Sequence, residues 1–528
     1  MVVNRVHGKT MPVVARGRLE WKIFLIVWIF LSANVSQFGP QLNTMVKSIL
    51  LLSMTLVDHN QIMLDRQIDP YVPRMLPENI DNIPSQHLHL LADLSYYAGH
   101  YYSGMPPGLS WAGVPVYIVI KSVTKLIPQT NKGFKEFAPS EITRLVLAVA
   151  LTVLFVAPLT ALAAVLMLRI LITLGATPNN AIWGVVAFVW GSLFVLYGTF
   201  VSHNAVGALL AFVTFAIIFS EWNRAPGRKV TSPIRLFGAG LLAGLAVTTE
   251  YSEVLTIVVL LGYSCLRLGV KRSVIFMLGI GIVAALHGYY AYVAFDSAID
   301  TPYAHRFLPI YGARGLYYLV YPHVGKIWKL CFGPVRGIFI FMPWALISCG
   351  SALMVIRLKT RFHIEAWCTL TVVVSFLLYN SSIDPHLPAY GFGARFMIGA
   401  IPFLVVGLGF MPGLLNHKSV RSLIALAVIL DGLVLLAGSP MGTGETFGSA
   451  HIYVMKLIAE YGPRTQVMRV LSTNVHSLSW PANVLLFSVW VSVLTVVCIS
   501  AARIVDRIYG MNQTGHIGKN GRGGLGVG

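Results

Sequence analysis

A series of long apolar runs, separated by short polar connections, constrains this chain more than any other feature. The run from Leu145 to Leu168 carries no charged residue and is long enough to span a hydrocarbon layer of about 30 Å. Only 11% of the 528 residues are charged, against roughly 25% in an average soluble domain, which is too few to cover a soluble surface of this size. A bilayer removes that requirement, and helices satisfy their own backbone there. The sequence therefore predicts an all-α polytopic membrane protein.

The apolar runs predict a bundle of about 11–13 transmembrane helices. No internal repeat at a fixed period is visible, which weakens an inverted-repeat transporter interpretation without excluding it. The predicted spans lie near 22–38, 108–126, 145–168, 179–200, 204–220, 234–250, 252–268, 273–295, 337–356, 364–380, 394–414, 421–438 and 483–502.

The net charge of +19 does not indicate nucleic-acid binding, because the Lys and Arg residues are scattered through short connections. Such scatter is typical of cytoplasmic loops in membrane proteins, so membrane lipids are expected partners and nucleic acid is not. Segments 296–336, 381–393 and 439–482 are then extracytoplasmic. The connections predicted to be cytoplasmic carry Arg224–Arg235, Arg267–Arg272, Arg357–Arg361, His417–Arg421 and Arg503–Arg507.

The chain divides into a basic N-terminus (1–21), one transmembrane domain (22–510) and a Gly-rich tail (511–528) that is predicted to be disordered. The N-terminal segment is expected to be cytoplasmic and followed by an uncleaved first span. The first five runs do not alternate cleanly with the basic connections. One of them is therefore re-entrant, interfacial or misassigned, and the run 108–126, interrupted by Pro115 and Lys121, is the main suspect.

Loop 39–107 is the predicted seat of the chemistry, because it is long and holds six of the twenty acidic residues. Its stretch 42–57 has helical apolar spacing and could lie along the membrane surface. The loop closes with a tyrosine-rich segment that ends in Pro106, Pro107 and Gly108, which predicts a rigid turn back to the bilayer. Rings that stack on sugars and carboxylates that accept from hydroxyls suit a sugar site; an interfacial aromatic belt is the structural alternative.

Five segments between residues 40 and 405 resemble motifs of the GT-C superfamily of polyprenyl-phosphate-sugar-dependent glycosyltransferases. The segment Asp93–Gly108 is similar to the family pattern that closes the first periplasmic loop, with Met105 where the family usually has Lys. In the segment Gly391–Leu404, Ala394 stands where the family usually has Pro. The other four similar segments are Gly198–His203, Gly244–Tyr251, Val335–Pro343 and Gly391–Leu404.

The resemblance implies a GT-C-like bundle in a bacterial cytoplasmic membrane, with a large first extracytoplasmic loop. It implies transfer of a sugar from a polyprenyl-phosphate donor to a hydroxyl of a glycan, lipid or protein acceptor, usually with inversion. A carboxylate must take the acceptor proton. Asp65 and Asp93 are the candidate catalytic bases, and Asp58 and Asp69 remain open alternatives.

Cations at the outer ends of spans are candidate partners of the lipid phosphate, since an anion would offset the cost of burying them. Arg395 and Arg336 are the residues expected there, although an arginine that snorkels to water is the alternative. Further candidate substrate-binding residues are Glu250, His203, His100 and Tyr102.

No cofactor or metal is required by the sequence. The five cysteines form no Cys-x-x-Cys pair, and although the acidic loop could hold a divalent cation, no spacing indicates one. Two other functions stay open: a transporter or flippase of lipid-linked sugars, and a non-catalytic subunit of the same fold, which the departures at Met105 and Ala394 would suit.

Overall fold

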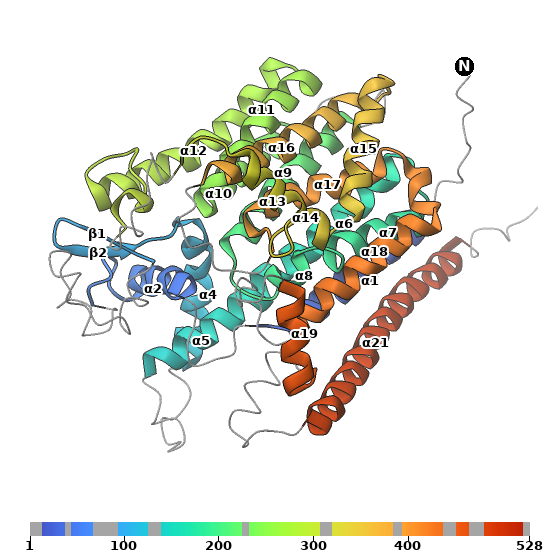
Figure 1. Ribbon diagram of the computed structural model, residues 1–528, viewed down its shortest axis with the longest axis horizontal. Coiled ribbons are helices and arrows are strands. Elements are labelled where there is room, and N and C mark those ends of the chain that lie inside the picture. The colour runs from blue at the N-terminus through green and yellow to red at the C-terminus, as the bar shows by residue number, and fades with distance from the viewer. Residues whose placement is uncertain are drawn as a thin grey trace, which may run out of the picture.

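The computed structural model describes residues 13–36, 44–66, 93–124, 139–223, 232–306, 319–383, 393–436, 450–463 and 480–520. Most helices run roughly along one direction, and a small hairpin of β1 (Leu94–Tyr97) and β2 (His100–Ser103) projects at one end (Figure 1). The helices are α1 (Val13–Ala33), α2 (Thr44–Asp58), α4 (Gly108–Thr124), α5 (Pro139–Leu151), α6 (Ala157–Thr173), α7 (Pro178–Val189), α8 (Phe194–Tyr197), α9 (His203–Trp222), α10 (Pro233–Thr249), α11 (Val254–Leu268), α12 (Val270–Phe295), α13 (Val324–Phe332), α14 (Ile338–Phe341), α15 (Trp344–Arg357), α16 (His363–Ser382), α17 (Ile401–Gly409), α18 (Lys418–Leu436), α19 (Ala450–Tyr461) and α21 (Trp480–Asn520). A π-helical turn, η4 (Thr152–Val156), joins α5 to α6, and 3₁₀ turns form η5 (Tyr251–Glu253), η6 (Pro302–His305), η7 (Arg395–Ala400) and η8 (Pro412–Asn416).

The described part of each predicted apolar run is mostly helical, although some runs are divided between elements, among them 145–168 (α5, η4 and α6), 179–200 (α7 and α8), 337–356 (α14 and α15) and 394–414 (η7, α17 and η8). Six helical segments of the described chain are long and apolar enough to cross a membrane, and further apolar helices are shorter. The prediction of a helical membrane protein is therefore confirmed, whereas the number of crossings and the likeness to the GT-C bundle stay predictions. The six segments are Thr143–Thr173, His203–Trp222, Tyr251–Leu268, Val270–Phe295, His363–Ser382 and Trp480–Tyr509.

The first helix and the long helix α5–η4–α6 are antiparallel neighbours. Arg169, near the end of α6, forms two hydrogen bonds with Glu20, near the start of α1, at 2.8 and 2.6 Å. Further along, Trp28 Nε1 donates to the carbonyl of Val153 at 2.8 Å. The end of α1 and the start of α5 therefore lie at the same end of the bundle.

Helix α4 lies on the suspect run 108–126, and its role as a span or as a packed helix stays a prediction. It is continuous through Pro115, and the Lys121 ammonium is neutralised by Asp58 of α2 at 2.5 Å.

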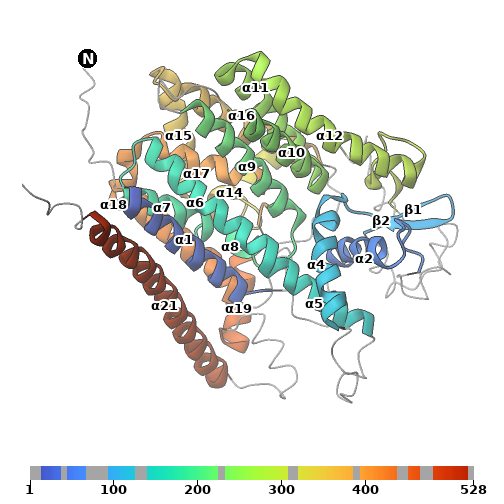
Figure 2. The same ribbon diagram turned by 180° about the vertical axis from the view of Figure 1, so that it is seen from behind.

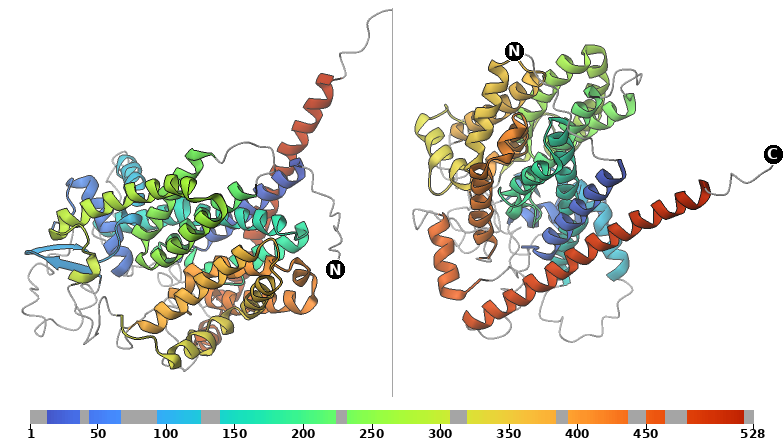
Figure 3. Two further views of the ribbon diagram at one scale, coloured as in Figure 1. Left: turned by 90° about the horizontal axis from the view of Figure 1, so that it is seen from above. Right: turned by 90° about the vertical axis from the view of Figure 1, so that its right-hand side faces the viewer.

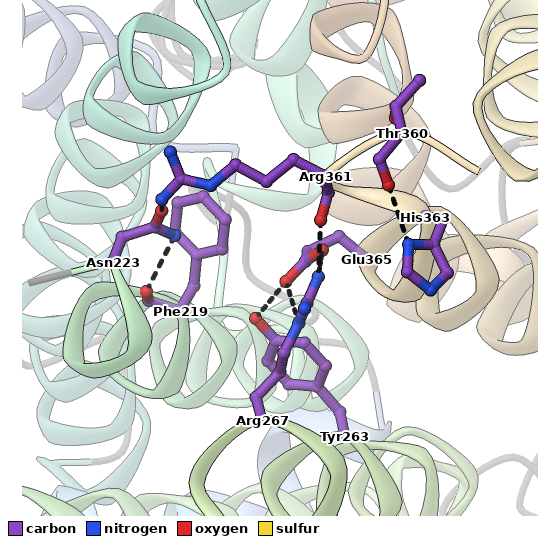
Figure 4. Close-up of polar contacts among 8 residues, drawn as sticks. All are labelled: Phe219, Asn223, Tyr263, Arg267, Thr360, Arg361, His363 and Glu365. Atoms are coloured by element: carbon purple, nitrogen blue, oxygen red, sulfur yellow. Dashed lines mark hydrogen bonds and ion pairs between the residues drawn. The ribbon is translucent and has the colours of Figure 1, made fainter. Parts of the chain in front are cut away.

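Three basic connections meet at one end of the bundle, which we call the basic end (Figure 4). Arg267, at the end of α11, donates to the Arg361 carbonyl at 2.9 Å, and Arg361 donates to Asn223, just after α9, at 3.0 Å. The opposite end, which carries β1 and β2, is called the hairpin end. This gathering is the arrangement expected of cytoplasmic connections, but the membrane side that each end faces stays a prediction.

The hairpin departs from the all-α expectation. Its strands pair antiparallel from Leu94 opposite Ser103 to Tyr97 opposite His100, so the tyrosine-rich segment is extended. Ala98 and Gly99 both have positive φ, at 49° and 89°, as a two-residue hairpin turn requires. Beside it, α2 covers the stretch 42–57 from Thr44 onward. This helix is largely buried inside the fold against α4 and β2, and any contact with a membrane surface stays a prediction.

The last helix, α21, lies along the outside of α1, as the views from behind and from the side show (Figures 2 and 3). Lys22 Nζ and Asp506 Oδ2 are 2.8 Å apart, which fixes their relative positions at the basic end. The helical backbone of α21 continues to Asn520, into the segment 511–528 whose disorder stays a prediction. Extending a helix that has already formed adds one hydrogen bond per residue, which favours this continuation. Residues 521–528 lie outside the described residues.

Candidate functional site

Asp93 lies directly before β1 and faces groups from two other segments. Its Oδ2 accepts a hydrogen bond from Thr44 Oγ1, at the start of α2, at 2.5 Å. Its Oδ1 lies 3.8 Å from Nη2 of Arg306, which follows η6. Both side chains of this ion pair are mostly buried, at 18% and 14% exposed, so water screens their attraction only weakly.

Tyr303 connects this ion pair to the ends of the bundle helices. The Arg306 guanidinium lies 4.5 Å from the centre of the Tyr303 ring, and the ring of Tyr251 is 5.4 Å away. Burial raises the pKa of the Tyr303 hydroxyl well above its usual range, and the negative charge of Glu250 adds to the effect. The hydroxyl therefore stays protonated and able to donate.

Glu250, between α10 and η5, is a buried carboxylate at this end, as is Glu253 three residues further along the chain. Glu250 Oε2 contacts Nε2 of His203 at 3.0 Å and accepts from Asn204 at 2.7 Å, both at the start of α9. Its Oε1 accepts from the backbone and the hydroxyl of Ser252. Since Ser202 caps α9, the positive end of that helix dipole also faces the carboxylate.

Arg395, the first residue of η7, is partly buried close to the carboxylates of Asp93 and Glu250. Tyr197, Asp93, Arg336 and Glu250 are its electrostatic neighbours, and its guanidinium lies 4.6 Å from the ring of Phe396. Arg336, in the turn before α14, is half-buried. We define the outer polar cluster as Asp93, His203, Glu250, Tyr303, Arg306 and Arg395.

Three nitrogens of the outer polar cluster are buried without a hydrogen-bond partner among the described residues. They are Nδ1 of His203, Nε of Arg306 and Nε of Arg395. A buried donor without a partner costs roughly 1–3 kcal/mol, and more when it is charged. Buried polar groups without partners call for an explanation, such as an ordered water, an ion or a ligand, and guanidinium groups prefer carboxylates and phosphates.

Asp65, His100 and Tyr102, also predicted as site residues, lie on a different part of the hairpin end. Asp65 Oδ2 contacts His100 Nδ1 at 2.8 Å, and its Oδ1 accepts from the backbone of Tyr101 at 2.9 Å. Both oxygens thus fix the hairpin to the segment after α2. Burial, with the neighbouring Tyr96 and Asp65, raises the pKa of Tyr101 to about 12. Tyr102 packs against Phe295 with ring centres 5.3 Å apart.

A second polar network, centred on Glu365, lies at the basic end (Figure 4). The Glu365 carboxylate receives two hydrogen bonds from Arg267 and one from Tyr263. The Arg267 guanidinium also stacks on Trp222, 3.7 Å from the ring centre. Unlike Arg306 and Arg395, Arg267 has no buried nitrogen without a hydrogen-bond partner in the described structure, which indicates a structural role for this network.

The predicted site residues are therefore divided between two places. The structure brings Asp93, Glu250, His203 and Arg395 together, with Arg336 as an electrostatic neighbour of Arg395. Within the described part of the chain, no group of three or more His, Cys, Asp or Glu residues could hold a metal ion.

Sequence reasoning missed Arg306, Tyr303 and Asn204. Arg306 and Tyr303 lie in the predicted extracytoplasmic segment 296–336, where no motif marks them. A basic residue next to tyrosines in an external segment was the available signal. Asn204 directly follows the predicted His203, so its position at the same helix start could have been inferred.

Comparison of the chain with protein-family models, curated proteins and solved structures gives no match.

Proposed function

We propose that this protein is a membrane glycosyltransferase that moves a sugar from a polyprenyl-phosphate carrier to an acceptor hydroxyl. The observation that carries the proposal is the pairing, in one buried cluster, of a carboxylate with arginines that have nitrogens without partners among the described residues. The likeness of five sequence segments to GT-C motifs supports the same chemistry, because three of them contribute Asp93, Glu250 and Arg395.

In the proposed reaction, Asp93 takes the proton of the acceptor hydroxyl. The acceptor oxygen attacks the anomeric carbon, and the bond from that carbon to the phosphate oxygen breaks. Polyprenyl phosphate leaves with one more negative charge, which the arginines stabilise. Asp93 suits the role better than Asp65, because only Asp93 faces cations that could hold the donor phosphate nearby.

Arg306 also offers a reason why Met105 can replace the Lys of the family pattern. Met105 is buried, at 3% exposed, within the hydrophobic core. Arg306 pairs with Ser95 of the same hairpin and therefore presents a positive charge from another segment. A departure at Met105 then need not mean a loss of phosphate binding.

The test compares Asp93→Asn with Asp65→Asn in membranes supplied with a panel of labelled polyprenyl-phosphate sugars. Loss of the base should reduce transfer at least 100-fold, within the usual contribution of general base catalysis. The Asp65→Asn variant should keep the transfer rate within about fivefold of wild type, since the Asp65 carboxylate forms hydrogen bonds to the hairpin. Protein abundance in the membrane is the control for folding.

Full transfer by the Asp93→Asn protein would refute the assignment of the base. A wild-type protein that moves labelled lipid-linked sugar across vesicles without forming a transfer product would instead support the flippase alternative. A wild-type protein that does neither would favour a non-catalytic subunit.

A further inference from the structure

A groove of about 900 Å³ lies at the basic end, between α1, α6, α9 and α10. On α9 its lining begins at Ala216, 13 residues or about 20 Å from His203 of the outer polar cluster. On α10 the lining extends to Leu245, five residues before Glu250. None of the lining residues belongs to that cluster, and binding in the groove does not depend on the proposed function.

The walls of this groove are apolar, and its rim is cationic. Leu166, Ile170, Ile217, Leu241 and Leu245 line the walls. The rim is formed by Arg16, Arg169 and Arg235, whose side chains are 37%, 49% and 59% exposed.

Two carboxylates lie behind these arginines. Glu20 pairs with both Arg16 and Arg169 and is 12% exposed, and Glu221 pairs with Arg235 and is fully buried. Three guanidinium groups against two recessed carboxylates leave one net positive charge. The surface that a ligand would meet is more positive than this net charge of one, because the arginine side chains are exposed and the carboxylates lie behind them.

We propose that the groove holds one anionic glycerophospholipid of the adjacent leaflet, with its phosphate on the arginines and an acyl chain along the apolar walls. A narrow apolar groove between membrane helices, rimmed by outward arginines, complements a negatively charged headgroup attached to a hydrocarbon chain. A soluble phosphate would match the rim but not the walls, so the lipid is the better fit.

Gly238 offers a direct way to block the groove. It lines the groove on α10, and a Cβ built there meets nothing within 4 Å. A Gly238→Leu side chain can therefore enter the space without disturbing a neighbour, and leucine forms helices better than glycine. Gly262 on α11 also has open space at its Cβ but is not part of the groove, so Gly262→Leu is a matched control.

Native mass spectrometry of the full-length protein in mild detergent tests the proposal, with phosphatidylglycerol and phosphatidylcholine as the added lipids. The wild type should retain one phosphatidylglycerol at least tenfold more strongly than phosphatidylcholine. Gly238→Leu should lower that retention at least tenfold, and Gly262→Leu should leave it unchanged. Arg235→Gln should reduce the preference between the two headgroups.

Three results would overturn the proposal. Unchanged retention in the Gly238→Leu protein would place the lipid elsewhere. Equal retention of both lipids by the wild type would show that the arginines do not select charge. Displacement of the lipid by millimolar inorganic phosphate would identify the ligand as a soluble anion. A melting temperature measured for each variant separates loss of binding from loss of fold.

Discussion

Arg306 distinguishes the outer polar cluster from an ordinary buried ion pair. One of its nitrogens faces Asp93, its guanidinium lies over Tyr303, and its Nε has no partner in the described structure. A guanidinium that is only partly satisfied by the protein keeps donors for a ligand. This property suits contact with a phosphate that gains charge during the reaction.

Replacing Arg306 by Gln should therefore lower sugar transfer about 100-fold, the usual effect of removing one group that stabilises developing charge. Arg306→Lys keeps the charge but loses the fork geometry, and it should recover part of the activity. Initial rates in membranes measure both effects. Arg272→Gln, at an exposed arginine of the basic end, is the matched control. Transfer by the Arg306→Gln protein within twofold of wild type would count against this role.

At the level of single residues, sequence predicted those members of the cluster that stand in recognisable motifs. Asp93, Glu250 and Arg395 each lie at the end of a predicted span or loop, so hydropathy and motif together located them. Arg306 could not be found in this way, because its contact with Asp93 joins positions more than 200 residues apart. The pairing of Asp65 with His100 likewise depends on how the hairpin folds back.

The hairpin and α4 together position Asp93 against the bundle. Gly104 donates its backbone N–H to the carbonyl of Asp93 at 2.9 Å, which closes the base of the hairpin. Next along the chain, the start of α4 packs against the end of α10, where a Cβ on Gly108 would meet Thr249 Oγ1 at 2.6 Å. The same short segment therefore ties Asp93 to the helix that ends at Glu250.

A Gly104→Ala substitution should disturb this arrangement, since its Cβ would meet the Asp93 carbonyl oxygen at 2.5 Å. A displacement of about 1 Å at a catalytic group can lower the rate roughly 100-fold, and we expect a loss of that order in transfer assays. Gly99→Asn, at the hairpin turn, is the control, because nothing lies within 4 Å of a Cβ there and Asn tolerates a positive φ. Equal activity of the two variants would show that the hairpin base does not position Asp93.

The positions of the helices were predicted more reliably than which of these helices cross the membrane. Hydropathy located the helices because burial in lipid demands long apolar runs. It could not assign a membrane role to α4, since a mostly apolar helix of 17 residues suits both a short span and a packed helix. The contacts of Glu20 with Arg169, which hydropathy could not show, bring the first part of α1 beside the end of α6.

At the scale of the whole molecule, the two ends of the bundle differ in how their charges are satisfied. The basic end holds Glu365 fully buried, with Arg267 bonded to both of its oxygens. An ion pair of this kind is costly to break from one side, because the remaining charge stays buried and unpaired. Replacement of both partners by apolar groups costs less.

Arg267→Met should therefore destabilise the protein by about 3–5 kcal/mol. The double variant Arg267→Met, Glu365→Met should be more stable than that single variant. Thermal unfolding of the purified protein in detergent gives both comparisons. A double variant whose loss of stability equals the sum of the losses in the two single variants would mean that the two groups act independently, contrary to the ion pair shown in Figure 4.

The contact of α21 with α1 joins residues 484 positions apart, through Lys22 and Asp506. Between the synthesis of α1 and that of α21, this side of α1 therefore lacks the contacts that it has in the folded protein. A chain truncated before α21 should expose that side of α1.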